Sequence, residues 1–194
     1  MKLKPHEVNP VITMTAIGNV CLQWSRFEIS ILMVIFALED IPPEKGDIIY
    51  GGLDWKPRLN MAINLAEYHK APHSIRKRLR ALRNRIRNED LNERRNQVVH
   101  GAQSASEGGK TNFMMSRWPQ PKKIQALSPV EIGALGTVLM EIGQEAAEIF
   151  DAIGAWKFPE HCDEDHGHPV TEPNSVSLFK LAQNTYARMK NFWR

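Results

Sequence analysis

Cysteine is scarce in this chain, which limits how the fold can be stabilised. The 194 residues include two cysteines, Cys21 in an apolar segment and Cys162 in a polar one, and no CxxC pair. Two isolated cysteines provide neither a disulfide framework nor a paired-thiol metal motif. We therefore expect a reducing compartment.

Long apolar runs are also lacking. No uninterrupted run reaches the roughly 18 to 20 residues that a membrane span requires, and Met1 to His6 lacks the apolar segment of a secretory signal. We therefore expect no membrane partner and a cytoplasmic location. With 42% hydrophobic and 24% charged residues, the composition is that of an ordinary globular protein with one core.

Acidic residues are absent between Pro72 and Asn88, where positive charge is concentrated. The seven cationic residues there are Arg76, Lys77, Arg78, Arg80, Arg83, Arg85 and Arg87. A solvated helix face is one interpretation of such a run. Because six of the seven are arginine, whose forked guanidinium suits phosphate, a polyanion-binding surface is the other.

Apolar periodicity predicts four main helices. They are expected from residue 9 or 13 to 39 or 40, from 55 to 70, from 73 or 74 to about 100, and from 128 to 155 or 156. Pro42 and Pro43 end the first helix, and Pro42 to Asp54 is expected to be a connection, with Asp54 capping the second helix. A final helix is predicted from 176 to 193.

The third predicted helix is interrupted. Its apolar residues recur at spacings of four, three and four up to Ile86, but Asn88 to Asp90 carries none and Leu91 falls out of phase. We therefore predict a bend or short break between Asn88 and Asn92.

A different pattern lies between the third and fourth main helices, from about 102 to 127. The turn signal Gly108-Gly109 and the flanking segments 111–115 and 122–127 predict a small β-hairpin or an irregular flap. Ser128, Pro129 and Glu131 then predict a capped helix start.

The segment from His161 to His168 is dense in His, Cys, Asp and Glu, but it is an unconvincing metal site. All its candidate ligands lie within eight residues, whereas zinc sites usually draw on two separated pairs. A solvated acidic loop is the favoured interpretation, and no metal or other cofactor is predicted.

The stretch from Glu93 to Gly101 is the strongest candidate for chemistry. On a helix, Asn96 and His100 lie about 40° apart, whereas Arg95 lies about 140° from His100. Only the length of an arginine, or a loosened helix end, brings Arg95 to the imidazole. Val98 and Val99 indicate that this helix end packs against another surface, so two interpretations are open. It is either a hydrogen-bonded segment of the core or of an interface, or a polar catalytic face held in place by an apolar contact.

The residues Arg95-Asn96-Gln97-Val98-Val99-His100 match the RNxxxH motif without a gap, and Gly101 follows. The chain therefore resembles the HEPN (higher eukaryotes and prokaryotes nucleotide-binding) superfamily. An apolar first helix with Trp24 and Glu28, and long helices before and after the motif, extend the resemblance over roughly residues 10 to 156.

The resemblance implies an all-α, HEPN-like helical bundle of four to five helices. A domain covering 1–156 would carry the β-hairpin or irregular flap as an insertion. Residues 157–194 would add an irregular loop and a C-terminal helix packed on the same domain.

The resemblance also implies a metal-independent endoribonuclease that cleaves single-stranded or looped RNA in a composite homodimer site. Arg95, Asn96 and His100 would be catalytic, and many relatives are toxins or antiviral effectors, so an antitoxin or effector protein is a candidate partner. Glu28 would either orient a catalytic group or close a contact one helical turn away. The expected RNA-binding residues are Arg76, Lys77, Arg80, Arg83 and Arg87. A non-catalytic nucleotide-, RNA- or protein-binding module remains the alternative.

Overall fold

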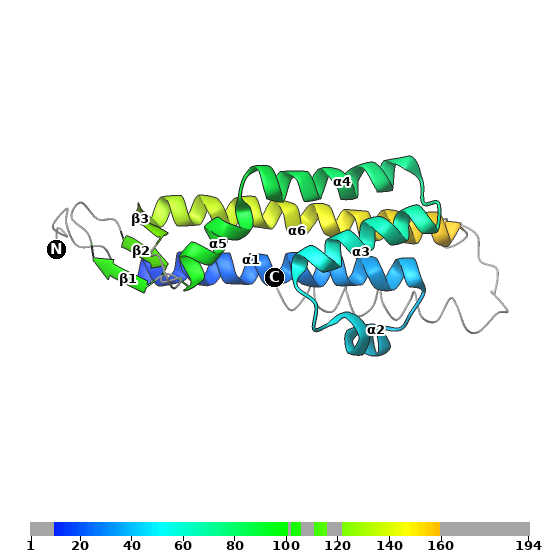
Figure 1. Cartoon of the computed structure of the whole chain (residues 1–194), viewed down its shortest axis with the longest axis horizontal. Helices are drawn as coiled ribbons and strands as arrows, with labels where there is room; N and C mark the ends of the chain where they lie inside the picture. The colour runs from blue at the N-terminus through cyan, green and yellow to red at the C-terminus, as the bar shows by residue number, and fades with distance from the viewer. Residues whose placement is uncertain (1–9, 101, 106–110, 116–121, 160–194) are drawn as a thin grey trace, which may run out of the picture. The chain divides into compact units, whose positions relative to one another are not determined.

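The computed structural model describes residues 10–100, 102–105, 111–115 and 122–159, and this part of the chain is mostly helical (Figure 1). Its six helices are α1 (Pro10–Glu39), α2 (Pro43–Tyr50), α3 (Trp55–Tyr68), α4 (His73–Asn88), α5 (Leu91–His100) and α6 (Pro129–Lys157). The predicted predominance of helix is confirmed. The predicted C-terminal helix lies outside the described residues.

A three-stranded antiparallel sheet lies between α5 and α6 in the sequence. Its strands, in the order β1-β2-β3, are β1 (Ala102–Ala105), β2 (Thr111–Met115) and β3 (Lys122–Leu127). Ala102 pairs with Met114, and Thr111 pairs with Leu127. Since β1 begins two residues after His100, the sheet follows directly on the motif.

The chain divides into two compact units, and α1, α4 and α6 contribute residues to both. The first unit draws on Met1–Phe27 and Asn84–Gln144, and here α1 and α6 approach closely. A Cβ added at Gly143 would lie 3.6 Å from the backbone nitrogen of Phe27, and one at Gly136 would overlap the side-chain nitrogen of Asn19. Glycine at these positions lets the two helices pack at short range.

The second unit draws on Glu28–Arg83 and Glu145–Arg194. Its core contains fully buried side chains from four helices, namely Ile31, Ile35, Leu38, Leu59, Leu79, Leu82, Ile149 and Ile153. Lys157 donates from Nζ to the carbonyl oxygen of Leu38 at 2.6 Å, which satisfies a carbonyl near the end of α1. Burial lowers the pKa of Lys157, and the nearby acids Asp40 and Glu39 oppose that shift.

Helix α2 corrects the expected connection from Pro42 to Asp54. Pro43 occupies the first turn, where its missing N–H costs nothing, and Gly46 packs against the Phe36 ring with no room for a Cβ. The loop after α2 is fixed by Arg58, whose Nη2 donates to the carbonyl oxygen of Gly51 at 2.5 Å.

The predicted break before the motif is confirmed. Helix α4 ends at Asn88, and α5 begins at Leu91. Between them Asp90 has a φ of 51°, in the left-handed region where asparagine and aspartate occur more readily than most non-glycine residues. The chain therefore changes direction just before Arg95.

Helix α1 passes a length and composition test for membrane spans, although the sequence contains no uninterrupted apolar run of that length. Its most apolar window has a mean hydropathy of 1.5, and 61% of that window is buried inside the structure. The core helix of a soluble protein passes the same test, so this finding does not settle the location.

The predicted cap of α6 is confirmed. The backbone N–H of Glu131 donates to Ser128 Oγ at 3.2 Å, and that of Ser128 donates to Glu131 Oε2 at 2.7 Å. Asp54 occupies the predicted N-cap position of α3 but makes no side-chain capping bond.

Substituting Ser128 should therefore destabilise the fold. Losing an N-cap hydroxyl costs about 1 kcal/mol, so we expect Ser128→Ala to lower Tm by roughly 2 to 4 °C. Thr137→Ala removes an exposed hydroxyl within the same helix and is the matched control. Equal melting temperatures for the two variants in a thermal melt would show that the cap contributes nothing measurable.

Candidate active site

Helix α5 carries the motif and is anchored by two fully buried side chains, Leu91 and Val98. An isolated helix of ten residues is marginal in water, so these contacts supply much of its stability. Arg95 and Asn96 are half-buried, whereas His100, the last residue of α5, is exposed. The motif therefore lies at a helix end that is fixed on one side and open to solvent on the other.

The three motif side chains meet within one chain. Arg95 Nη1 donates to Asn96 Oδ1 at 2.8 Å and lies 3.1 Å from His100 Nε2. Helix geometry separates the two residues by about 140°, so contact within one chain required the length of an arginine or a loosened helix end. The long arginine side chain spans the difference, so Arg95, Asn96 and His100 form one hydrogen-bonded cluster, which we call the motif cluster.

A hydrogen bond between Arg95 and His100 is compatible with one tautomer of the imidazole only. A guanidinium can only donate, so Nε2 of His100 must accept, and the proton of the neutral ring must be on Nδ1. Protonation of Nε2 would place two N–H groups opposite each other. The contact is a hydrogen bond only when His100 is in the neutral Nδ1–H tautomer.

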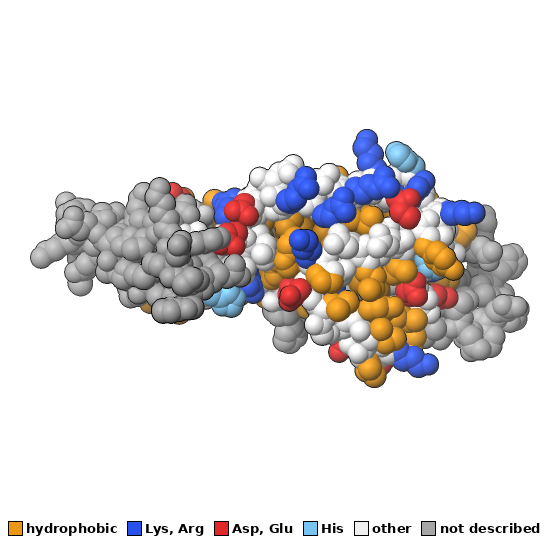
Figure 2. All heavy atoms as spheres, in the orientation of Figure 1, with side chains coloured by type: hydrophobic (Ala, Val, Ile, Leu, Met, Phe, Trp, Pro, Cys, Tyr) orange, Lys and Arg blue, Asp and Glu red, His pale blue; other side chains and the backbone are white. Residues whose placement is uncertain are grey.

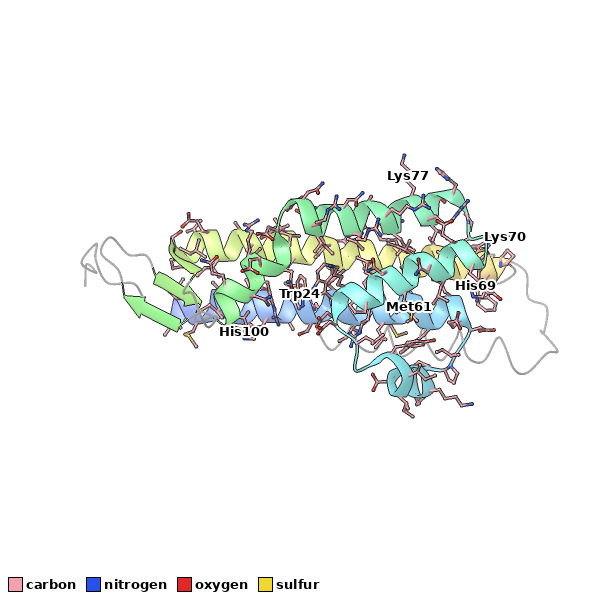
Figure 3. The ribbon with its side chains drawn as sticks, viewed as in Figure 1. Trp24, Met61, His69, Lys70, Lys77 and His100 are labelled. Carbon is pink, nitrogen blue, oxygen red and sulfur yellow. The ribbon has the colours of Figure 1, made fainter. Side chains whose placement is uncertain are left out.

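The guanidinium of Arg95 lies over a buried aromatic ring. Its central carbon is 5.7 Å from the ring centroid of Trp24, a residue of α1 that is only 1% exposed. Figure 3 labels Trp24 and His100, which belong to the same unit of the fold. Arg95 Nε is buried without a hydrogen-bond partner, and no described acidic side chain pairs with this guanidinium.

Glu28 belongs to the second unit, and its described contact involves the backbone only. Its carbonyl oxygen accepts from Arg58 Nη1 at 3.4 Å. Within the described part of the chain, its carboxylate has no hydrogen bond or ion pair that supports either role predicted for it.

The basic run forms α4, and Lys and Arg side chains gather over this helix (Figure 2). Acidic partners neutralise part of this charge. Arg76 and Arg80 both bind Glu67 of α3, at 2.9 and 2.7 Å, and Arg78 binds Glu148 of α6 at 2.8 Å. Several cations of this run therefore have a structural role in the fold.

Arg85 is held even more firmly. It binds Glu141 at 2.5 Å and Glu89 at 3.1 Å, and its hydrogen bond to Glu141 is the main reason why the pKa of Arg85 is raised. The predicted RNA-binding residues fall into two groups. Arg76 and Arg80 are paired with Glu67. No ion pair within the described ranges involves the other three, Lys77, Arg83 and Arg87. No local sequence pattern indicates this division, because the acidic partner of Arg76 and Arg80 lies on another helix.

Metal ligands do not cluster in the described part of the chain, where no group of three or more His, Cys, Asp or Glu side chains is placed to hold an ion. The segment from His161 to His168 lies outside the described residues.

The double ion pair of Glu67 predicts a specific acid sensitivity. Its hydrogen bond with Arg76 lowers the pKa of Glu67 below the ordinary value of 4.5, despite the opposing effect of burial. The unfolded chain therefore takes up this proton at a higher pH than the folded chain, and acid below about pH 4.5 removes the stabilisation. We expect Glu67→Gln to show a smaller fall in Tm between pH 7 and pH 4.

Glu44→Gln is the control for this measurement, because Glu44 is exposed and makes no ion pair with a described residue. The same fall in Tm for wild type and both variants would exclude a contribution of Glu67 to acid sensitivity.

Comparison with known proteins gives this site no name. No protein-family model, curated protein or solved structure matches the chain. The functional interpretation therefore depends on the motif and on the geometry of the described residues.

Proposed function

We propose that this chain is a metal-independent endoribonuclease of the HEPN type that cleaves single-stranded or looped RNA. One observation carries the proposal: Arg95 is a half-buried cation with no described anionic partner, 3.1 Å from an exposed imidazole. A cation in this environment favours an anionic ligand, and an imidazole transfers protons near neutral pH. The match to RNxxxH adds RNA as the substrate.

The chemistry needs only groups of this kind. Abstraction of a proton from the RNA 2′-hydroxyl lets its oxygen attack the adjacent phosphorus, and the bond to the 5′-oxygen then breaks as that oxygen gains a proton. His100 suits the proton transfers, and Arg95 would stabilise the charge that gathers on the phosphoryl oxygens. Asn96 would hold Arg95 in place through the bond to Oδ1. The products are a 2′,3′-cyclic phosphate and a 5′-hydroxyl.

Substrate binding would change the motif cluster in a defined way. In the resting geometry Nε2 of His100 faces Arg95 Nη1, so its lone pair is occupied. A phosphate oxygen that accepts from Nη1 would replace the imidazole there. The displaced Nε2 would then be free to take the proton from the 2′-hydroxyl.

A homodimer would complete the site. The motif provides one imidazole per chain, whereas the reaction uses both a base and an acid. Two copies related by a twofold axis supply both. The same proposal includes a HEPN-like bundle that carries β1 to β3 as its flap. It also includes a cytoplasmic location and a role as a toxin or antiviral effector, which an antitoxin would counter.

Removing the imidazole should abolish cleavage. We expect His100→Ala to reduce the cleavage rate of a mixed RNA substrate by roughly 100-fold or more, the usual contribution of a general acid or base. Wild-type cleavage should survive EDTA and leave 2′,3′-cyclic phosphate ends, as detected by end-specific labelling.

His73→Ala is the matched control, because His73 is an exposed histidine at the start of α4. It should cleave at the wild-type rate. A folded, dimeric wild-type protein that leaves varied RNAs intact would rule out the ribonuclease.

A non-catalytic RNA- or nucleotide-binding module is the second candidate. The observation that favours it is the unneutralised charge of Lys77, Arg83 and Arg87 on α4. Such a surface binds phosphates without needing the chemistry of the motif cluster.

Removing two of these cations tests that surface. If Arg83 and Arg87 each contact one phosphate of single-stranded RNA, Arg83→Ala with Arg87→Ala should reduce the slope of log K against log salt by about 1.4. Fluorescence anisotropy over a salt series measures this slope. The control, Lys45→Ala with Lys56→Ala, removes two exposed cations elsewhere. An unchanged slope in the arginine variant would exclude this part of α4 from the RNA interface.

A further inference from the structure

We propose that Trp24 is a positioning residue that fixes Arg95 without occupying any of its N–H donors. This inference deepens the proposed function and rests on it for the identity of the ligand. It starts from the geometry of a buried indole beneath a half-buried guanidinium, 5.7 Å from ring centroid to central carbon.

The ring of Trp24 is itself held rigidly. Trp24 is 1% exposed, and its ring lies 5.3 Å from that of Phe27, a fully buried residue of the same helix. An aromatic ring in such a position cannot turn away without disrupting the core. The indole therefore provides a fixed surface on which the guanidinium lies.

The partner of Arg95 differs in kind from the partners of the arginines on α4. Arg76 and Arg85 are fixed by carboxylates, which neutralise their charge and occupy N–H donors. An indole attracts the guanidinium through its face and accepts none of the in-plane hydrogen bonds. The contact with Trp24 therefore neither neutralises the charge of Arg95 nor uses any of its N–H groups.

The arrangement also explains how Arg95 would remain in place during a reaction. The hydrogen bond to His100 must break when the imidazole takes up a proton at Nε2 or when a phosphate occupies Nη1. The contact with Trp24 does not depend on the state of His100. Trp24 and Asn96 would thus hold the guanidinium throughout, while its partner at Nη1 changes.

The first test measures the tautomer of His100 by ¹⁵N NMR on the full-length protein. The ring signals of His100 are assigned by their absence in His100→Gln. We expect the Nδ1–H form in wild type and a shift towards Nε2–H in Trp24→Leu, because Arg95 would no longer be held against Nε2. Trp24→Phe keeps an aromatic ring with a weaker attraction for cations and should give an intermediate result. This variant tests the proposal even if Trp24→Leu does not fold.

The second test is a double-mutant cycle on RNA cleavage. We expect Trp24→Leu to lower kcat by about tenfold, less than the loss for deleting an electrostatic donor outright. The same substitution should have no further effect in the Arg95→Ala background, because Trp24 acts only through Arg95. Phe150→Leu, which truncates a buried aromatic residue in the other unit, should lower kcat by the same factor in both backgrounds.

The outcomes separate this inference from the proposed ribonuclease. A tautomer shift in a protein that cleaves no RNA would support the role of Trp24 and overturn the ribonuclease. If Trp24→Phe cleaves RNA with the wild-type kcat and shows the wild-type tautomer of His100, the role of Trp24 is overturned and the ribonuclease stands. Equal losses from Trp24→Leu with and without Arg95 would also overturn it, since they would indicate a general effect on the core.

Discussion

The placement of the Arg95 guanidinium on Trp24 is the interaction on which the motif cluster depends. Removing a cation from water costs several kcal/mol after the protein relaxes. A desolvated cation–π contact returns about 2 kcal/mol, and each hydrogen bond to Asn96 or His100 returns about 1 kcal/mol more. For the half-buried Arg95 these contacts offset part of the cost of desolvation.

Helix α5 is what brings Arg95 to that ring. The turn at Asp90 uses a left-handed backbone conformation, which costs a non-glycine residue of the order of 1 kcal/mol. Burial of Leu91 immediately after the turn, and of Val98 two turns later, offsets that cost by about 1.5 to 3 kcal/mol for each side chain. The break is therefore part of how the motif is positioned, because it lets α5 pack in its own direction instead of continuing α4.

Much of this arrangement could be predicted from the sequence, because it depends on local patterns. The apolar stripe that ends at Ile86, the loss of phase at Leu91 and the serine cap of α6 each specify a short segment and its ends. Helix α2 was missed because it has few apolar residues and a glycine in its middle, and only its contact with Phe36 explains that glycine. Helical-wheel angles describe where a Cβ points, so they left open whether the side chain of Arg95 reaches His100 within one chain. The pairing of α4 arginines with acids of α3 and α6 depends on tertiary packing that no local pattern contains.

The contact between Arg95 Nη1 and His100 Nε2 has a consequence for how a site of the proposed kind would be controlled. While Nε2 accepts a hydrogen bond from Arg95, its lone pair is occupied. A base appears only when another acceptor occupies Arg95 Nη1, and a phosphate oxygen is the acceptor that the proposed substrate brings. Activation of the 2′-hydroxyl would then be coupled to correct placement of the adjacent phosphate. Because the motif of one chain holds a single imidazole, the proposed reaction would need a second group to protonate the leaving 5′-oxygen, and a second copy of the same helix end is the simplest source.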